Sequence, residues 1–287
     1  MKHALTIDVE DYFQVAAFKS NVNPQEWDTY RSRVELNTHR FMEIIAEHDV
    51  RATFFFLGWI AERYPNLVRE VVAAGHEIGC HGYSHQLIYE QSSRLFREET
   101  HRAKALLEDQ IQKSIKGYRA ASYSITDRSL WALDAIADAE FEFDSSIYPI
   151  RHDNYGLLGG PHEPYRIELA NGRSIVEFPI TTAPVANFSI PVGGGGYFRI
   201  LPYALTRKLL HKREQEIGAP FVFYLHPWEL DPQQPRIRNA SLKSRFRHYT
   251  NLNRVAPRLH KLLSEFDFAP MGEVLEQCRY LQSHSYG

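Results

Sequence analysis

Hydrophobic and polar residues alternate along this chain in blocks that predict short strands followed by longer helices. Apolar runs such as residues 3–9 and 51–58 are typical of strands buried inside a sheet. Between such runs, residues 32–48 and 92–113 carry apolar side chains every three or four positions, as one face of a helix does. Further strands are predicted at residues 76–81, 115–124, 141–149 and 221–231. Six or seven such strand–helix units predict an α/β fold, a barrel or incomplete barrel of parallel strands.

The alternation is interrupted between residues 151 and 199. Pro- and Gly-rich stretches there surround one β segment at residues 174–181, and we expect an insertion on the rim, not a second domain. Within it, four successive glycines at residues 193–196 suit either a close backbone approach to a ligand or a flexible linker. The tail predicts two helical pieces that close the domain. We therefore predict a single domain over residues 1–287, with a core over about 3–230 and a C-terminal extension over about 231–287.

The end of the third predicted strand carries a candidate metal site. His81 and His85 lie four positions apart beside glycines, so both imidazoles could bind one ion, although such a pair also occurs in ordinary polar loops. Asp8 and Glu10, at the end of the first strand, share one face because side chains alternate along a strand. Asp11 follows at the turn and could also reach inward. The acids could instead form a solvated strand end or cap a helix.

Other predicted strands also end in polar or aromatic residues. They are Arg119 and Tyr123, Asp144, and His226 with Trp228. Barrels of parallel strands collect their chemistry at the carboxyl ends of the strands, so this recurrence predicts an enzyme.

Composition narrows the choice of partners. The net charge of −2 and a pI near 6.7 give no case for nucleic acid or an anionic membrane. Two cysteines, far apart, exclude a disulfide framework and a Cys-rich zinc cluster. No secretion signal or run of about 18 apolar residues occurs, so we expect no membrane span and a cytoplasmic protein. The 16 Tyr and 4 Trp suit stacking on sugar rings.

Four motifs, in order, carry a family resemblance. They are T-I-D-V-E-D from Thr6, H-G-Y-S-H from His81, R-A-A-S-Y from Arg119 and L-H-P from Leu225. This order resembles the polysaccharide deacetylase family, the metal-dependent carbohydrate esterases with a nodulation-deacetylase homology domain. D-V-E-D-Y-F and L-H-P-W-E are similar to the branch associated with bacterial exopolysaccharide gene clusters. The resemblance implies a distorted, TIM-like (β/α)7 barrel and a divalent ion, Zn²⁺.

The resemblance also implies roles for individual residues. Asp8 would be the general base, oriented by Arg119, and His226 the general acid. His81 and His85 would be metal ligands. The family pattern has adjacent aspartates, whereas Val9 follows Asp8 here, so the strand period makes Glu10 the better third ligand, with Asp11 as the alternative.

The remaining expectations concern the substrate. Tyr123, Trp228 and Asp144 would lie at the substrate site, with Asp144 also supporting His226 and a backbone N–H near Tyr123 holding the oxyanion. The implied reaction removes N-acetyl groups from amino sugars of a polysaccharide or its precursor. Two alternatives stay open: hydrolysis of a cyclic amide or imide, as in allantoinase-like proteins, and a non-catalytic carbohydrate-binding protein of the same fold.

Overall fold

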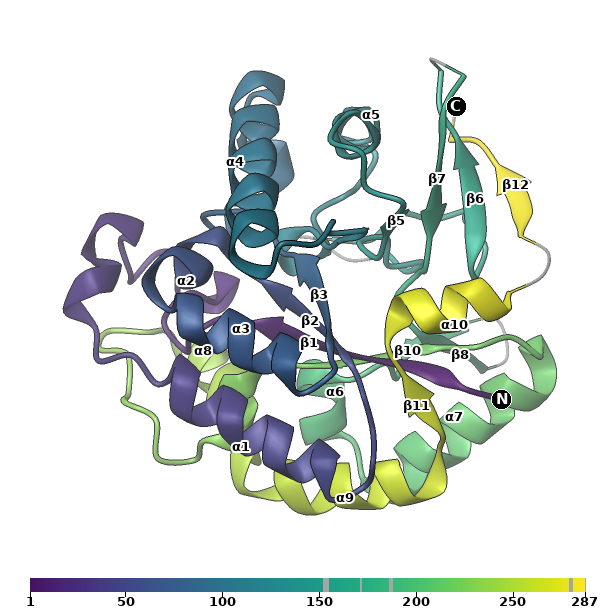
Figure 1. The fold of residues 1–287 in the computed structure, drawn as a ribbon. Helices are drawn as coiled ribbons and strands as arrows, with labels where there is room; N and C mark the ends of the chain where they lie inside the picture. The colour runs from purple at the N-terminus through teal and green to yellow at the C-terminus, as the bar shows by residue number, and fades with distance from the viewer. Residues whose placement is uncertain (152–154, 171, 186–187, 279–280, 287) are drawn as a thin grey trace.

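A mostly parallel sheet forms the centre of the protein (Figure 1). The computed structural model describes residues 1–151, 155–170, 172–185, 188–278 and 281–286. Along the sheet the strands are β10 (Val222–Leu225), β1 (His3–Val9), β2 (Thr53–Phe56), β3 (Glu77–Cys80), β4 (Gly117–Tyr118), β5 (Phe143–Asp144), β7 (Ser174–Glu177), β6 (Tyr165–Glu168) and β12 (Gln282–His284), and β11 (Phe268–Ala269) also pairs with β1. Among the described strands of this sheet, only β6 and β7 pair antiparallel. The predicted α/β fold with a parallel sheet is confirmed.

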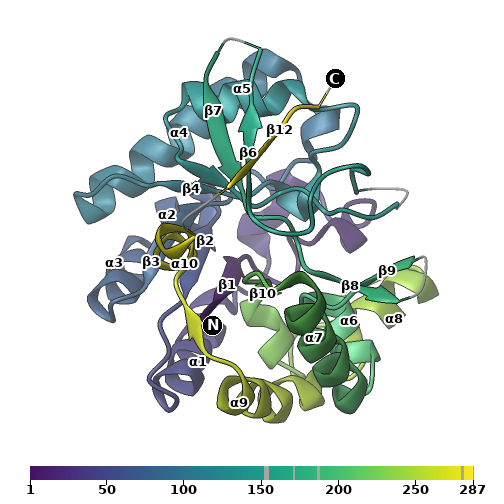
Figure 2. The ribbon, with the colours of Figure 1, turned by 90° about the vertical axis from the view of Figure 1, so that its right-hand side faces the viewer.

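The helices lie outside the strands (Figure 2). They are α1 (Val34–Ala46), α2 (Gly58–Arg63), α3 (Pro65–Ala73), α4 (Ser93–Ile111), α5 (Trp131–Asp138), α6 (Gly195–Ile200), α7 (Tyr203–Ile217), α8 (Leu242–Tyr249), α9 (Val255–Glu265) and α10 (Met271–Gln277). Helix α4 illustrates why they form: the Ser92 side chain accepts a hydrogen bond from the N–H of Leu95, and apolar residues spaced at helical intervals are buried. Every residue of β1 is buried, since strands and helices cover it on both sides. None of the described helices is both long and apolar enough to cross a bilayer.

The glycine run at residues 193–196 packs against β10. Gly194 has φ 127°, and a Cβ there would lie 1.9 Å from the carbonyl oxygen of Tyr224, so a side chain would clash with the strand. The N–H of Tyr224 donates to Gly193 O at 2.7 Å, and the N–H of Gly193 donates to Thr181 O at 3.2 Å. The run therefore connects residues that follow β7 with β10. Its glycines are needed for a close approach to a strand, not for a flexible linker.

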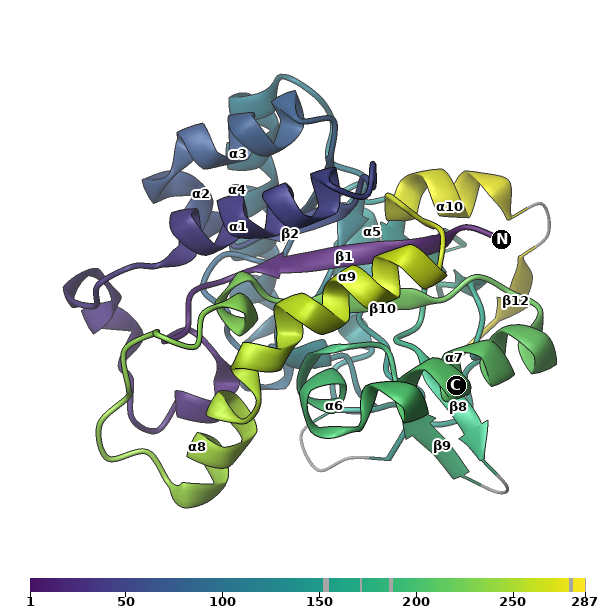
Figure 3. The same cartoon turned by 90° about the horizontal axis from the view of Figure 1, so that it is seen from below.

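The predicted insertion over residues 151–199 contains β6, β7 and a separate hairpin of β8 (Thr182–Val185) and β9 (Phe188–Pro191). Residues 152–154, 171 and 186–187 of this insertion lie outside the described residues. At the other end of the chain, α9 runs along β1 and β10 on the side that faces the viewer in Figure 3. Helix α8 lies at the end of the molecule toward which β1 points, the end that carries the candidate site (Figures 1 and 3).

Candidate active site

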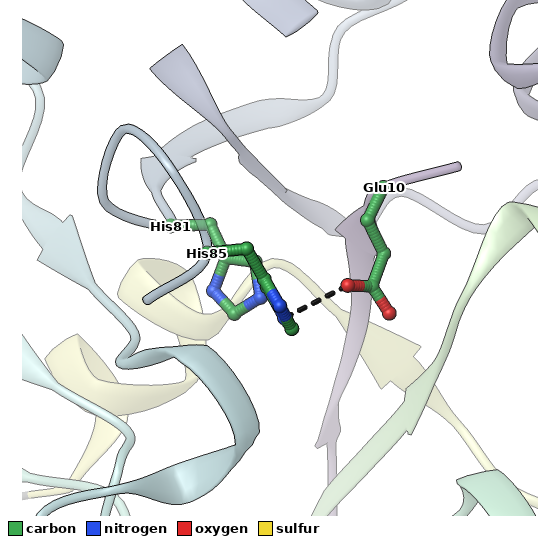
Figure 4. Close-up of side chains that lie close together, drawn as sticks. All are labelled: Glu10, His81 and His85. Carbon is green, nitrogen blue, oxygen red and sulfur yellow. Dashed lines mark ion pairs between the residues drawn. The ribbon is translucent and has the colours of Figure 1, made fainter. Parts of the chain in front are cut away.

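Glu10, His81 and His85 converge at the carboxyl ends of β1 and β3 (Figure 4). One possible ligand atom from each residue lies within 4.8 Å of those of the other two. Glu10 directly follows β1, and His81 directly follows β3, which is held beside β2 by the bond from His81 N–H to Phe56 O at 2.8 Å. Gly82, with φ 72°, and His85, with φ 53°, turn the next loop back toward Glu10. The structure thus brings these three predicted ligands together.

Hydrogen bonding fixes the orientation of one imidazole. The Nδ1–H of His81 donates to the carbonyl oxygen of Arg119 at 2.8 Å, which leaves Nε2 with a free lone pair. Burial lowers the pKa of His81 to about 4, so the ring is neutral near pH 7. A neutral, oriented imidazole is the form that binds a metal.

The third side chain also suits a metal. Oε2 of Glu10 is buried and lies 2.8 Å from Nε2 of His85, so the carboxylate faces that imidazole directly. Burial alone would raise the pKa of Glu10, but His85 and His226 outweigh it and hold the pKa well below its usual range. Two imidazoles and one carboxylate are a common donor set for catalytic zinc. The residues present therefore fit a divalent ion.

Asp11, the alternative ligand, is occupied elsewhere. Its Oδ2 accepts hydrogen bonds from the Ser32 hydroxyl at 2.7 Å and from the N–H groups of Arg33 and Val34 at 2.8 and 3.2 Å. These amides belong to the start of α1, so Asp11 satisfies donors that a helix leaves free. The helix-cap interpretation thus describes Asp11, and Glu10 is the carboxylate that faces the histidines.

Asp8 and Arg119 form a buried pair beside the histidines. Nη1 of Arg119 donates to Asp8 Oδ1 at 2.8 Å and to Thr6 Oγ1 at 2.7 Å, and its Nη2 donates to the Ser145 hydroxyl at 2.8 Å. Burial alone would raise the pKa of Asp8, but Arg119, His81 and His226 lower it below its usual value, so the carboxyl is ionised. The guanidinium is thus fixed at several points and holds one carboxylate oxygen, while Oδ2 faces the site.

His226 lies near the carboxylates of Asp8 and Glu10 and is held by Glu229. Nε2 of His226 is 3.3 Å from Glu10 Oε1 and 3.9 Å from Asp8 Oδ2. Its Nδ1 lies 2.8 Å from Glu229 Oε1, and the other oxygen of Glu229 accepts from Nε of Arg199 at 2.6 Å. Burial alone would lower the pKa of His226, but these carboxylates raise it to about 9. The imidazole is therefore protonated and oriented.

The expected support of His226 by Asp144 is wrong. Asp144 is fully buried and accepts from the Ser146 hydroxyl at 2.5 Å, and its pKa is raised to about 6 by burial. Its neighbour across the sheet is Glu177, whose pKa burial raises well above the usual value. Two buried carboxyls side by side cannot both ionise cheaply, so the pair retains a proton. Asp144 is also 0% exposed, so it offers no surface to a substrate.

Trp228 and Tyr123, both predicted to bind substrate, are also largely covered. Trp228 is 5% exposed, its indole N–H donates to Glu10 Oε1 at 3.2 Å, and its ring stacks on the imidazoles of His226 and His248. It therefore orients Glu10 and has little free ring for a sugar. The Tyr123 hydroxyl donates to Asp8 Oδ2 at 3.4 Å.

The backbone around Tyr123 is strained. Ser122 and Tyr123 have φ values of 51° and 56°, which non-glycine residues adopt at a cost. The N–H of Tyr123 itself donates to Ala120 O at 3.1 Å, so the oxyanion donor predicted near Tyr123 would have to be a neighbouring backbone N–H. The strained turn instead aims the Tyr123 hydroxyl at the site.

Comparison with known proteins identifies the protein families and the curated relatives that this chain resembles. Residues 27–139 match the family described as polysaccharide deacetylase, and residues 145–276 match a domain of unknown function, DUF3473. Residues 27–139 of this chain thus belong to the polysaccharide deacetylase family. A peptidoglycan-N-acetylglucosamine deacetylase of Bacillus cereus is 33% identical over 81 residues, which cover 28% of this chain and 28% of that protein. A chitooligosaccharide deacetylase of Rhizobium leguminosarum bv. trifolii is 33% identical over 109 residues, 34% of this chain and 51% of that protein.

Solved structures share the fold of this chain. A structure described as a polysaccharide deacetylase from Mycobacterium smegmatis superposes with a TM-score of 0.62 at 20% identity, covering 99% of this chain and 93% of that one. A CE4 family pseudoenzyme from Bacillus anthracis gives a TM-score of 0.51 at 15% identity, covering 100% and 69%. The matches to the two curated relatives span about half of their length or less. Because one neighbour is a pseudoenzyme, the fold does not by itself establish activity.

Sequence reasoning missed Glu229, Thr6 and Ser145. A signal for Glu229 was present, since His226 and Glu229 stand at the two positions of a capping box with Pro227 as the first helical residue. The hydroxyls of Thr6 and Ser145 gave no comparable signal, because only the folded chain brings them to Arg119.

Proposed function

We propose that the protein is a metal-dependent hydrolase that removes N-acetyl groups from amino sugars of a polysaccharide or its precursor. The observation that carries the proposal is the convergence of Glu10, His81 and His85 beside an ionised Asp8. The ion held by these three ligands, which we take to be Zn²⁺, would supply an acidified water and polarise the acetamide carbonyl. The deacetylase relatives support acetylated sugars as the substrate class.

Two residues of the chain carry out the two proton transfers, Asp8 as the base and His226 as the acid. Asp8 accepts the proton of the attacking water at Oδ2, the oxygen that Arg119 leaves free. Arg119 keeps this carboxylate ionised and in place. His226, held at Nδ1 by Glu229, presents Nε2 to the same space and donates a proton to the departing amine, which leaves poorly as an anion.

The finer fold assignment belongs to the same proposal. We take the sheet to be a distorted, incomplete (β/α)7 barrel within one domain, with the active site at the carboxyl ends of its strands. The hydrogen bonds through Gly193, from Thr181 on one side to Tyr224 on the other, support this assignment because they connect the two flanks of the sheet. The similarity to the exopolysaccharide-associated branch favours a polymer, or a precursor of one, over a small free sugar.

Acetate release tests the proposal. Purified protein loaded with Zn²⁺ should release acetate from N-acetylglucosamine oligosaccharides, lose activity with a chelator and regain it with added metal. His81→Ala should abolish both activity and metal binding, whereas His101→Ala, at an exposed position on α4, should change neither.

Two results would contradict the proposal. Ring opening of cyclic amides without acetate release would favour the allantoinase-like alternative. Oligosaccharide binding without either reaction, by protein that contains no metal under any loading condition, would favour a non-catalytic carbohydrate-binding protein.

A further inference from the structure

Helix α8 presents an apolar stripe to solvent. Leu242 is 83% exposed and Phe246 is 58% exposed, and residues four positions apart lie on the same face of a helix. His248, on a different face, is buried and stacks on the ring of Trp228 at 4.1 Å. The helix is thus anchored through one face while two large apolar side chains point away from the protein.

Cationic side chains surround this stripe. Residues 232–264 contain eight Lys or Arg and no Asp or Glu, in a chain whose net charge is −2. The exposed cations nearest the stripe in sequence are Arg236, Arg238, Lys243, Arg245 and Arg247. Within the described ranges, no carboxylate forms an ion pair with any of these five. Residues 232–264 are therefore strongly basic, although the net charge of the whole chain is close to zero.

We propose that α8 and residues 236–238 form a docking face for an anionic phospholipid bilayer. An interfacial helix pairs Leu or Phe, which enter the boundary between headgroups and acyl chains, with Lys and Arg, which attract anionic headgroups. Lys243 and Arg247, also four positions apart, flank the apolar stripe on one side, and Arg245 flanks it on the other. An acidic polysaccharide or a nucleic acid would use the cations but gives no reason to expose Leu242 and Phe246.

A groove next to the docking face suits a lipid headgroup. It has a volume of about 500 Å³ and is lined by Arg236 and Arg238 together with Tyr12, which follows Glu10 by two residues. Arg236 also lies over the Tyr249 ring, 4.0 Å from its centre. Arg236 is therefore packed on α8, and both cations line the groove together with the chain that leaves β1.

The docking face is linked directly to the candidate active site. His248 of α8 stacks on Trp228, and the Trp228 indole donates to Glu10. Nε2 of His248 also lies 2.6 Å from Oε1 of Gln234. A bilayer bound by α8 would thus bring a substrate that is attached to lipid close to the side chains that act on it, without any spanning helix.

Vesicle sedimentation tests the docking face independently of catalysis. The full chain should sediment with vesicles of phosphatidylcholine containing about 30% phosphatidylglycerol but not with pure phosphatidylcholine, and about 1 M salt should release it. Lys243→Glu/Arg247→Glu and Leu242→Ser/Phe246→Ser should each weaken partitioning at least about tenfold. A matched control on α7, Leu205→Ser/Lys208→Glu, removes one exposed apolar residue and one exposed cation and should partition like the wild type.

Other outcomes would overturn the proposal. An anionic bilayer is excluded as the partner if the wild-type protein does not sediment with anionic vesicles, or if it binds neutral vesicles equally well. So does vesicle binding that both α8 variants retain. The wild-type protein could instead bind an immobilised acidic polysaccharide and not bind vesicles. If the Lys243→Glu/Arg247→Glu variant then lost the binding to the polysaccharide, the face would be assigned to a polymer. Acetate release from a soluble oligosaccharide should stay unchanged in the α8 variants, which separates this result from failure of the proposed function.

Discussion

Substituting the two candidate carboxylate ligands separately should decide which one binds the metal. Glu10 has a buried oxygen, Oε2, which lies 2.8 Å from Nε2 of His85 and faces the histidines. Asp11 accepts hydrogen bonds from the Ser32 hydroxyl and from the N–H groups of Arg33 and Val34. Turning its carboxylate toward the metal would leave these N–H groups at the start of α1 without an acceptor. Glu10→Gln should therefore disable the site, and Asp11→Asn should not.

The magnitude follows from the position of each side chain. Loss of a residue that merely supports a ligand costs about 10–100-fold in metal affinity, so loss of a ligand should cost at least about 100-fold, or about 2.8 kcal/mol. For Asp11→Asn we expect zinc affinity within about threefold of wild type, with a free energy of unfolding lower by about 1 kcal/mol because the start of α1 loses part of its cap.

Competition between the protein and a chromophoric chelator measures the zinc affinity, and chemical denaturation of the metal-free proteins measures the stability. An unchanged zinc affinity in Glu10→Gln would refute our reasoning. So would a loss of about 100-fold in Asp11→Asn with no loss in Glu10→Gln. Trp228→Phe provides an intermediate case. It removes the indole donor to Glu10 and keeps an aromatic, though smaller, ring between His226 and His248, and we expect about a tenfold weaker site.

Three further predictions concern protons. Asp8→Asn should reduce acetate release at least about 100-fold while elemental analysis still finds one metal per chain, and parallel loss of metal would count against the role of general base. Glu229→Gln should lower kcat by about 10–100-fold with little change in KM, because His226 loses its partner at Nδ1; an unchanged kcat would show that this contact is only structural. Buried His3 has its pKa lowered to about 3 by burial and by Arg213, so its contribution to stability is complete above its ordinary pKa and declines as the pH falls below about 6.5. Between pH 7 and pH 5 this should cost about 2 kcal/mol of unfolding free energy, and denaturation of His3→Gln should show a shallower pH dependence than wild type.

Some features of the site follow from local sequence alone. Side chains alternate along a strand, so Asp8 and Glu10 had to share a face, and parallel strands had to bring His81 to the same edge of the sheet. The mostly parallel α/β arrangement followed from the alternation of apolar runs and amphipathic stretches in the same way. These inferences need only the geometry of a strand and the order of the elements.

Other features depend on contacts between distant segments. The sequence offered Asp144 as the support of His226, but the fold buries it beside Glu177 and leaves Glu229 to hold the imidazole. Trp228 reaches Glu10 across 218 positions in sequence.

The sequence by itself thus determined the class of fold and which polar residues stand at the strand ends, because strand and helix periods are local properties of the chain. Only the tertiary structure decided the partner of each carboxylate. Asp11 accepts hydrogen bonds at the start of α1, Glu10 faces the histidines, and Glu229 holds His226. It also decided that the basic residues around α8 stay unpaired with described carboxylates and exposed beside Leu242 and Phe246. Hydrogen bonds act over about 3 Å, so their partners are fixed only when the sheet and helices have packed.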